Sequence, residues 1–353
     1  MMSNRILFIT PGLTRGGAET QMVKVARFLK AQGKSVRILA LKPLNDFHDV
    51  DFQAEGIKVI FLSNWKRRFL TNTITLFSLV GQYRPNVVVA FMFIAIVFAR
   101  VLKLRYRFHL ISSVRSSVIS RKWQKLLKLT ARLDDLIVYN SNASKVNFET
   151  QSAAKRNGII INNAVAIPAV EPVDTGVSGE RPFVWVTVAH FRPAKDYRTL
   201  FRAMALLKDE PVRLDCLGHI REEWPYEMLR ELGIEDKVRI LGFQSNPGEF
   251  LRQSDGFVLS TFGEGSPNSM LEAMSYYKPV VASAVDGIEE FLRDAGCGFL
   301  ARGLDPEDLA SQMRYVMHLS PEERQKIGRK GRRYVEDNFS EEQVLEKWLQ
   351  VVC

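Results

Sequence analysis

Short apolar, β-branched runs alternate with longer helical patterns along the whole chain, and this alternation limits the fold more than any other feature. It is typical of β-α units on parallel sheets. In the first half the runs predict strands at residues 5–10, 35–41, 58–62, 86–91, 107–114, 136–139 and 158–161. A second series predicts strands at 183–189, 212–217, 238–241, 256–260, 279–283 and 298–301. The sequence therefore predicts an α/β protein with two doubly wound, Rossmann-like domains in tandem.

The chain also has the length of two domains, because 353 residues exceed what a single core usually holds. Between the two series of strands, proline, glycine and small polar residues replace any apolar period. We predict an N-terminal domain at 1–168, a linker at 169–182 and a second domain at 183–335. The rest, 336–353, carries apolar side chains at helical spacing and is expected to form a helix that packs back on the first domain.

Cysteine usage and hydropathy indicate a cytosolic compartment. Cys216, Cys297 and Cys353 form neither a disulfide framework nor a metal-ligand spacing. The first predicted strand begins at Arg5, so we expect no secretory signal peptide. The longest apolar run, 87–99, is shorter than the roughly 20 residues that cross a bilayer.

Charge is distributed unevenly. Residues 1–170 hold 26 Lys and Arg against 8 Asp and Glu, whereas the remainder is net acidic. The first half is therefore expected to meet an anionic partner. Two of its segments, 65–80 and 121–133, combine cations with apolar residues at helical spacing, which suits a helix lying on anionic lipid; solvated helix faces are the alternative. No nucleic-acid recognition motif accompanies the charge, so we expect no nucleic-acid partner.

Two loops that follow predicted strands carry candidate ligand-binding residues. In PGLTRGGAE, Gly16 and Gly17 would let a ligand approach the amides of a helix N-terminus, although a simple connector has the same composition. In VAHFRPAKDY, Arg192 and Lys195 could neutralise a diphosphate and stabilise its departure as a leaving group. A solvated basic loop is the alternative for this pair.

The stretch FGEGSPNSMLEAM, residues 262–274, places two carboxylates around a predicted helix start. Ser266 suits an N-cap and Pro267 the first helical position. The free amides of that first turn would form an anion site. Glu264 and Glu272 could accept hydrogen bonds from hydroxyl groups, so a ligand with a phosphate between sugar rings would use the whole arrangement.

These motifs occur in a particular order: GGAE, then R-x-x-K, then two glutamates separated by seven residues with Ala-Met after the second, then YYKPVVAS and VDGIEE. The ordered set resembles glycosyltransferase family 4, whose members are retaining nucleotide-sugar transferases of the GT-B fold. The resemblance covers nearly the whole chain, and INNAVA near the predicted linker resembles the family's Asn-Gly-Val-Asp turn. It implies a GT-B fold for this chain.

The resemblance also implies roles for individual residues. Glu272 would hold the ribose hydroxyls of the donor, and Glu264 would lie against the donor sugar. Lys195 would hold the diphosphate with the help of Arg192. The sugar and phosphate would lie along the main chain of Gly265, Ser266, Pro267, Asn268 and Ser269. All of these residues except the proline would offer a backbone N–H.

Two of the chain's departures from the family pattern concern charged or titratable residues of the candidate site. The family has an arginine five residues before the lysine, where this chain has His190, and Arg192 would supply the missing charge. The family's strand-end histidine in the first domain is replaced by Arg115, which would do electrostatic work at the donor sugar or turn towards the acceptor. Gly16 and Gly17 would close over the donor from the first domain.

We therefore expect a retaining glycosyltransferase that moves a sugar from a nucleotide diphosphate donor to a growing, lipid-linked glycan of a bacterial surface polysaccharide. A UDP-sugar is expected ahead of a GDP-sugar. The enzyme would be cytoplasmic and peripheral on an anionic membrane surface. It would need no cofactor and no metal, since we assign no metal site to Asp49 and Asp51. A GT-B sugar-nucleotide epimerase and an inactive, surface-binding relative are the alternatives.

Overall fold

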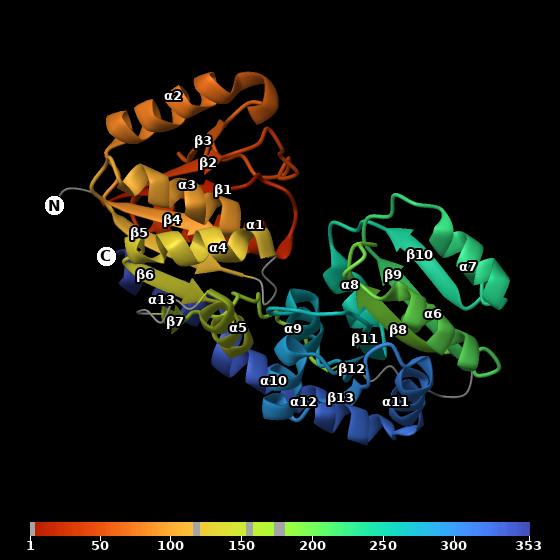
Figure 1. Ribbon diagram of the computed structural model, residues 1–353. Coiled ribbons are helices and arrows are strands. Elements are labelled where there is room, and N and C mark those ends of the chain that lie inside the picture. Colours follow the sequence, from red (N-terminus) through yellow and green to blue (C-terminus); the bar gives the residue numbers. More distant parts are fainter. Residues whose placement is uncertain (1–3, 116–120, 153–157, 173–180) are drawn as a thin grey trace. The chain divides into compact units, whose positions relative to one another are not determined.

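The computed structural model describes residues 4–115, 121–152, 158–172 and 181–353 (Figure 1). It divides the chain into two compact units. Unit 1 contains Met1–Ala164 and Glu342–Cys353, and unit 2 contains Val165–Glu341. The chain therefore crosses from one unit to the other twice.

Unit 1 is built on a parallel seven-stranded sheet with the order β3-β2-β1-β4-β5-β6-β7. Its central strands are continuous apolar runs because both faces of the sheet are covered by helices. Ile6 and Phe8 of β1 face one core, and Leu7 and Ile9 face the other. The strands are β1 (Arg5–Thr10), β2 (Ser35–Ala40), β3 (Lys58–Phe61), β4 (Val87–Phe91), β5 (His109–Val114), β6 (Leu136–Tyr139) and β7 (Gly158–Ile160).

The helices of unit 1 lie on both faces of this sheet (Figure 1). The first core holds side chains of α1 (Gly17–Ala31) and of the C-terminal helix α13 (Glu341–Val352), including the fully buried Trp348. The second core holds side chains of α2 (Trp65–Tyr83), α3 (Phe93–Lys103), α4 (Arg121–Thr130) and α5 (Asn142–Ser152). A short 3-10 helix, η1 (Ala131–Leu133), follows α4.

Unit 2 repeats the architecture with six parallel strands in the order β10-β9-β8-β11-β12-β13. These are β8 (Phe183–Val188), β9 (Val212–Leu217), β10 (Val238–Gly242), β11 (Gly256–Leu259), β12 (Val280–Ser283) and β13 (Gly298–Ala301). One face packs against α6 (Tyr197–Leu206), α7 (Trp224–Leu232) and α11 (Pro306–His318). The other packs against α8 (Pro247–Gln253), α9 (Asn268–Ser275), α10 (Asp286–Ala295) and α12 (Pro321–Phe339).

Every predicted strand is present, with bounds within two residues of the prediction. The division between the units differs from the predicted one, since it falls at Ala164 and Val165, before the predicted linker at 169–182. Val165 already belongs to unit 2 because its N–H donates to Phe339 O at 2.8 Å and it forms a β-bridge with Ser340. The C-terminal segment also starts later than the predicted residue 336, because α12 continues to Phe339.

Candidate active site

Two loops at the carboxyl ends of β8 and β11 lie side by side in unit 2. Lys195 forms an antiparallel bridge with Thr261, and Phe262 N donates to Ala194 O at 3.1 Å. From β8 the chain adds β9 and β10 on one side and β11 to β13 on the other, so this is where the strand order reverses. Ligands of doubly wound sheets bind outside the strand ends at such a switch point. The topology therefore marks this pair of loops as the candidate site.

The predicted diphosphate lysine and the predicted sugar-side glutamate contact each other. Lys195 Nζ forms an ion pair with Glu264 Oε1, and Thr261 Oγ1 lies 3.4 Å from the same oxygen. The two side chains retain 22% and 16% of their exposure, so neither is sealed from a ligand. Arg192 is exposed in the same loop, and its carbonyl accepts from Lys195 N at 2.8 Å. The structure thus brings Arg192, Lys195 and Glu264 together on the loops that follow the neighbouring strands β8 and β11.

The helix start differs from the prediction by one residue. Helix α9 begins at Asn268 and Pro267 occupies the N-cap, so the prediction that Ser266 caps a helix starting at Pro267 was wrong. The reason is that Pro267 has ψ 86°, outside the helical range, which leaves Ser266 one residue too early to reach the first-turn amides. Ser266 Oγ is instead buried without a hydrogen-bond partner among the described residues.

The loop before α9 is held by a close approach of α10. A Cβ atom at Gly287 would lie 1.9 Å from Glu264 O and 3.3 Å from Gly265 O, so only glycine fits there. Gly265 is buried, and Asn268 and Ser269 are half-buried at the start of α9. The backbone that carries Glu264 is therefore fixed by packing.

Glu272 lies further along the same helix. It belongs to the second turn of α9 and is half-buried. Its carbonyl accepts from Ser275 Oγ at 2.6 Å. Both predicted carboxylates thus belong to one continuous segment, with Glu264 before the helix start and Glu272 inside it.

An aromatic cluster at neighbouring strand ends was missed by the sequence analysis. His190 follows β8, His219 follows β9 and Phe243 follows β10. His219 N donates to His190 Nδ1 at 3.1 Å, and the His219 ring stacks on Phe243 with centroids 4.6 Å apart and planes 4° apart. The sequence analysis named His190 as a site residue but assigned no ligand role to His219 or Phe243. The signal that could have revealed the cluster is that each of the three residues comes just after a strand.

The remaining predicted site residues lie in unit 1. Gly16 is the N-cap of α1 and Gly17 its first residue. Arg115 follows β5 and is only 9% exposed. Its guanidinium donates to Ser113 Oγ at 2.9 Å, and also to Ile161 O at 3.2 Å and Asn163 Oδ1 at 2.9 Å. Burial lowers the pKa of Arg115 to about 9.

Arg115 is also flanked by aromatic rings. Its guanidinium carbon lies 5.3 Å from the ring centroid of Phe91 and 5.4 Å from that of Trp348. The side chain therefore links β4, β5, the segment after β7 and α13 within unit 1. These contacts hold Arg115 in place by groups of its own unit.

Asp49 and Asp51, to which we assign no metal site, have partners close by in their own unit. Asp49 forms an ion pair with Arg15, and Asp51 Oδ1 accepts from Ala54 N at 2.9 Å. The described residues contain no cluster of three or more His, Cys, Asp or Glu side chains arranged to hold a metal ion. Nor do they include a helix that combines the length and the hydropathy of a bilayer span.

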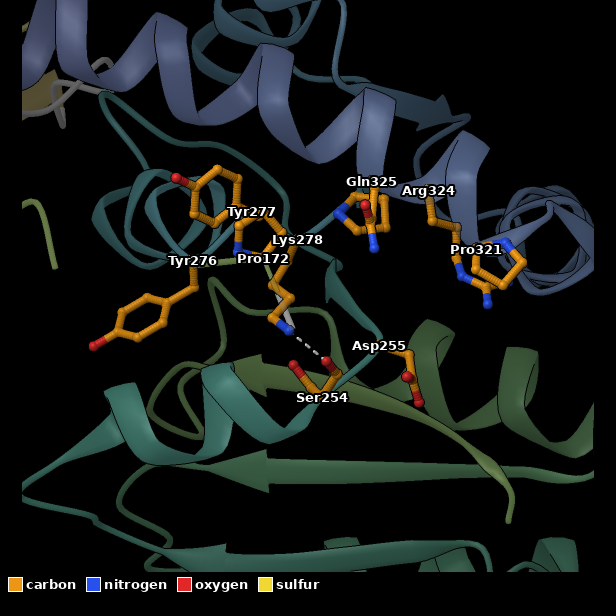
Figure 2. A pocket seen from close by; sticks show the side chains of 10 residues that line it. Pro172, Ser254, Asp255, Tyr276, Tyr277, Lys278, Pro321, Arg324 and Gln325 are labelled. Carbon is orange, nitrogen blue, oxygen red and sulfur yellow. Dashed lines mark hydrogen bonds between the residues drawn. The ribbon is translucent and has the colours of Figure 1, made fainter. Parts of the chain in front are cut away.

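A small cavity in unit 2 is lined by none of the predicted site residues (Figure 2). Its volume of about 30 Å³ has room for water but not for a nucleotide. Lys278 reaches into it and donates to Ser254 O at 2.6 Å and Arg252 O at 3.1 Å. Burial lowers the pKa of Lys278 to about 8. This cavity is where a buried lysine satisfies the carbonyls at the end of α8.

Comparisons with known proteins assign the class and then the family. HepE of Anabaena, solved in complex with UDP-glucose, superposes with a TM-score of 0.84 over 99% of both chains at 18% identity. Together with the two parallel sheets, this likeness identifies a GT-B fold. Family models match residues 15–168 as Glycosyltransferase Family 4 and residues 174–334 as Glycosyl transferases group 1. The chain belongs to this family of glycosyltransferases, as its motifs predicted.

Two curated relatives are lipopolysaccharide core biosynthesis glycosyltransferases of Rhizobium meliloti (strain 1021). LpsE is 26% identical over 202 residues, which are 56% of this chain and 58% of LpsE. LpsD is 24% identical over 348 residues, which are 96% of this chain and 95% of LpsD. The match to LpsE thus spans less than two thirds of that relative.

Proposed function

We propose that this protein is a retaining glycosyltransferase that uses a UDP-sugar to extend a lipid-linked glycan of a bacterial surface polysaccharide. The observation that carries the proposal is the arrangement at the β8–β11 switch point. A cation, a carboxylate, an unpartnered hydroxyl and a helix start come together there, from Lys195, Glu264, Ser266 and α9. A ligand with phosphates and sugar hydroxyls matches this set of groups.

The donor's diphosphate would lie between the cations and the first turn of α9. The free amides of that turn favour an anion, and Lys195 with Arg192 would add charge as the leaving group develops. To bind phosphate, Lys195 must exchange part of its ion pair with Glu264, and their residual exposure permits this. The freed carboxylate of Glu264 would then accept from hydroxyls of the donor sugar. In this arrangement no metal ion is needed, so EDTA should leave activity unchanged.

The nucleoside would extend from the diphosphate across unit 2. Glu272 would accept hydrogen bonds from the ribose hydroxyls. The stacked rings of His219 and Phe243 give an exposed aromatic surface on which a planar base can stack. We favour uracil because HepE, which shares the fold, was solved with a UDP-sugar.

Glu264 is assigned a positioning role. Retaining hydrolases place a nucleophilic carboxylate beside a second acid about 5–5.5 Å away. Lys195 pairs with Glu264 Oε1 and neutralises it, and Thr261 Oγ1 lies 3.4 Å from the same oxygen. We therefore propose front-face displacement. The acceptor oxygen bonds to the anomeric carbon as the carbon–phosphate oxygen bond breaks, and the hydroxyl proton passes to the leaving diphosphate on the same face.

The acceptor is proposed to be lipid-linked because unit 1 carries basic and apolar surface on its helices. On α2, Phe69, Leu70 and Ile74 are 62%, 74% and 69% exposed, and Arg67 and Arg68 beside them are exposed as well. Apolar side chains next to cations suit insertion into an anionic membrane surface. A cytoplasmic protein would thereby meet its acceptor at the membrane.

Donor choice is tested by thermal shift with UDP, GDP and ADP at one equal concentration, since a nucleotide present at about 100 times its dissociation constant adds roughly 2.7 kcal/mol and a weaker binder adds less. We expect UDP to raise the melting temperature most.

The anomeric configuration of the product, measured by NMR, tests retention. An epimerase would instead convert the UDP-sugar without any acceptor. An inactive relative would bind vesicles and turn over no donor.

Membrane association is tested by sedimentation with vesicles of phosphatidylglycerol and phosphatidylcholine. The double variant Phe69→Ser, Leu70→Ser should lose most of the binding. Leu304→Ser is the matched control, because Leu304 is 64% exposed in unit 2. Equal binding of the wild type and the double variant would contradict the assignment to α2.

A further inference from the structure

A buried arginine on α12 contacts three parts of unit 2 and has no role in the chemistry proposed above. Arg332 is 8% exposed. Its Nη1 donates to Ser275 O at 2.6 Å and to Pro168 O at 2.9 Å, and its Nε donates to Glu336 Oε1 at 2.5 Å. Ser275 is the last residue of α9, so Arg332 holds the end of the helix opposite to the proposed phosphate site.

Helix α12 also fits closely against the turn that ends α9. A Cβ atom at Gly328 would lie 2.0 Å from Tyr277 O, and one at Gly331 would lie 3.0 Å from Cys297 Sγ. Tyr277 has φ +61°, a conformation that a tyrosine adopts only when its surroundings impose it. Because Gly328 brings the backbone of α12 against that of Tyr277, and Gly331 brings it against the Cys297 side chain, α12 and the end of α9 have little freedom to shift independently.

The same arginine is connected to both places where the chain passes between the units. Those passages are Ala164 to Val165 and Glu341 to Glu342. Val165 N donates to Phe339 O at 2.8 Å, at the end of α12. Three residues further on, Pro168 O accepts from Arg332. One side chain thus links the end of α9 to the first passage directly and to the second through α12.

We propose that Arg332 is a positioning residue that couples donor binding at the first turn of α9 to the two passages between the units. The inference rests on the proposed donor site. A bound phosphate would order the start of α9, and since this helix is only eight residues long the ordering would extend to Ser275, from which Arg332 would pass it to Pro168 and Val165. Coupling between sites is reciprocal, so releasing the passages must also weaken donor binding.

Hydrogen exchange with UDP as the probe tests this coupling. In the wild type, UDP should slow exchange at 268–271 and, by about five- to tenfold, at the Val165 amide. In Arg332→Met the slowing at 268–271 should persist, whereas the slowing at Val165 should fall below about twofold. The dissociation constant of UDP should rise about five- to tenfold in the same variant, as reciprocity requires.

Arg333→Met is the matched control, because Arg333 is the next residue of the same helix and its side chain is 84% exposed. It should behave as the wild type. If Arg332→Met fails to fold, Glu336→Gln weakens the orientation of Arg332 from a carboxylate that is 43% exposed, and a partial loss of the Val165 effect is expected.

The outcomes separate the two proposals. Absence of UDP protection at 268–271 in the wild type would overturn the donor site itself. Protection there without any effect at Val165 would overturn only the coupling. If UDP slowed exchange at the Val165 amide as much in Arg332→Met and Glu336→Gln as in the wild type, Arg332 would have no part in the coupling.

Discussion

Arg115 in unit 1 and Lys195 in unit 2 both follow a strand of a doubly wound sheet, yet their surroundings differ. Arg115 is 9% exposed, bonds to neutral oxygens and is flanked by two aromatic rings. The Lys195 side chain is 22% exposed and pairs with a carboxylate on the neighbouring loop. The first arrangement is fixed by packing, whereas the second can exchange partners with a ligand.

The difference shows that a cation at a strand end is not by itself a ligand-binding group. An ion pair with residual exposure can open, because water or a ligand replaces each partner as it leaves. A guanidinium surrounded by rings and carbonyls can leave only by exposing those groups unpaired. We therefore expect substitutions at the two positions to affect different properties.

The largest expected effect is on activity, from Lys195→Ala. Loss of a cation from the developing leaving group should lower kcat/KM by about 10²–10³-fold, as is typical for removal of one electrostatic contact in a transition state. The UDP-induced rise in melting temperature should also disappear. Steady-state kinetics and thermal shift measure the two effects.

Arg202→Ala is the control for this variant, because Arg202 is an exposed arginine on α6 of the same unit. It should leave both readouts unchanged. A Lys195→Ala protein that keeps the full UDP shift would show that the phosphate is bound elsewhere, and the contrast with Arg115 would then fail.

The next effect is on stability, from Arg115→Met. Methionine fills much of the volume but removes the donors to Ile161 O and Asn163 Oδ1. Hydrogen bonds from a charged group are worth about 1.5–3 kcal/mol each, partly offset here by the cost of burying the charge, so we expect a loss of roughly 3 kcal/mol. Chemical denaturation measures it, and the UDP shift should remain. A large fall in kcat at unchanged stability would instead place Arg115 at a substrate.

How much of this could be read from the sequence depends on the range of the interactions. The strands were predictable because a buried parallel strand needs a continuous apolar run, which is a local property. The helix start failed by one residue because ψ of Pro267 depends on how the preceding loop lies against α10. The His219 and Phe243 stack depends on which strand ends become neighbours, and no spacing along the chain records that.

The burial of Arg115 is also a tertiary property. Like Lys195, it is a cation in the segment that follows a strand, although Arg115 comes directly after β5 and Lys195 lies further along the loop after β8. What separates them is that α13, almost at the end of the chain, brings Trp348 against the guanidinium. Motif order could therefore indicate the family and the candidate residues. It could not show which cations remain available to a ligand.

The smallest of the three effects concerns a second buried cation, Lys278 in unit 2. It is a change in the pH dependence of the free energy of unfolding. Burial lowers its pKa to about 8, from 10.5 in the unfolded chain. Below pH 8 the lysine is charged in both states, so the full cost of burying the charge applies. Between pH 8 and 10.5 the unfolded chain binds more protons, so this group's contribution to stability rises with pH. From pH 7 to 9.5 the gain should be about 2 kcal/mol.

Comparison with Lys278→Met isolates that gain from other titrations. The free energy of unfolding of the wild type, measured by denaturant at both pH values, should rise relative to the variant by that amount. The carbonyls of Ser254 and Arg252 lose their donor in the variant at every pH, so this cost cancels in the difference. A difference that stays constant from pH 7 to 9.5 would mean that Lys278 keeps its proton when buried. A buried lysine that donates only to carbonyls would then keep its proton in this pH range, as a lysine paired with a carboxylate does.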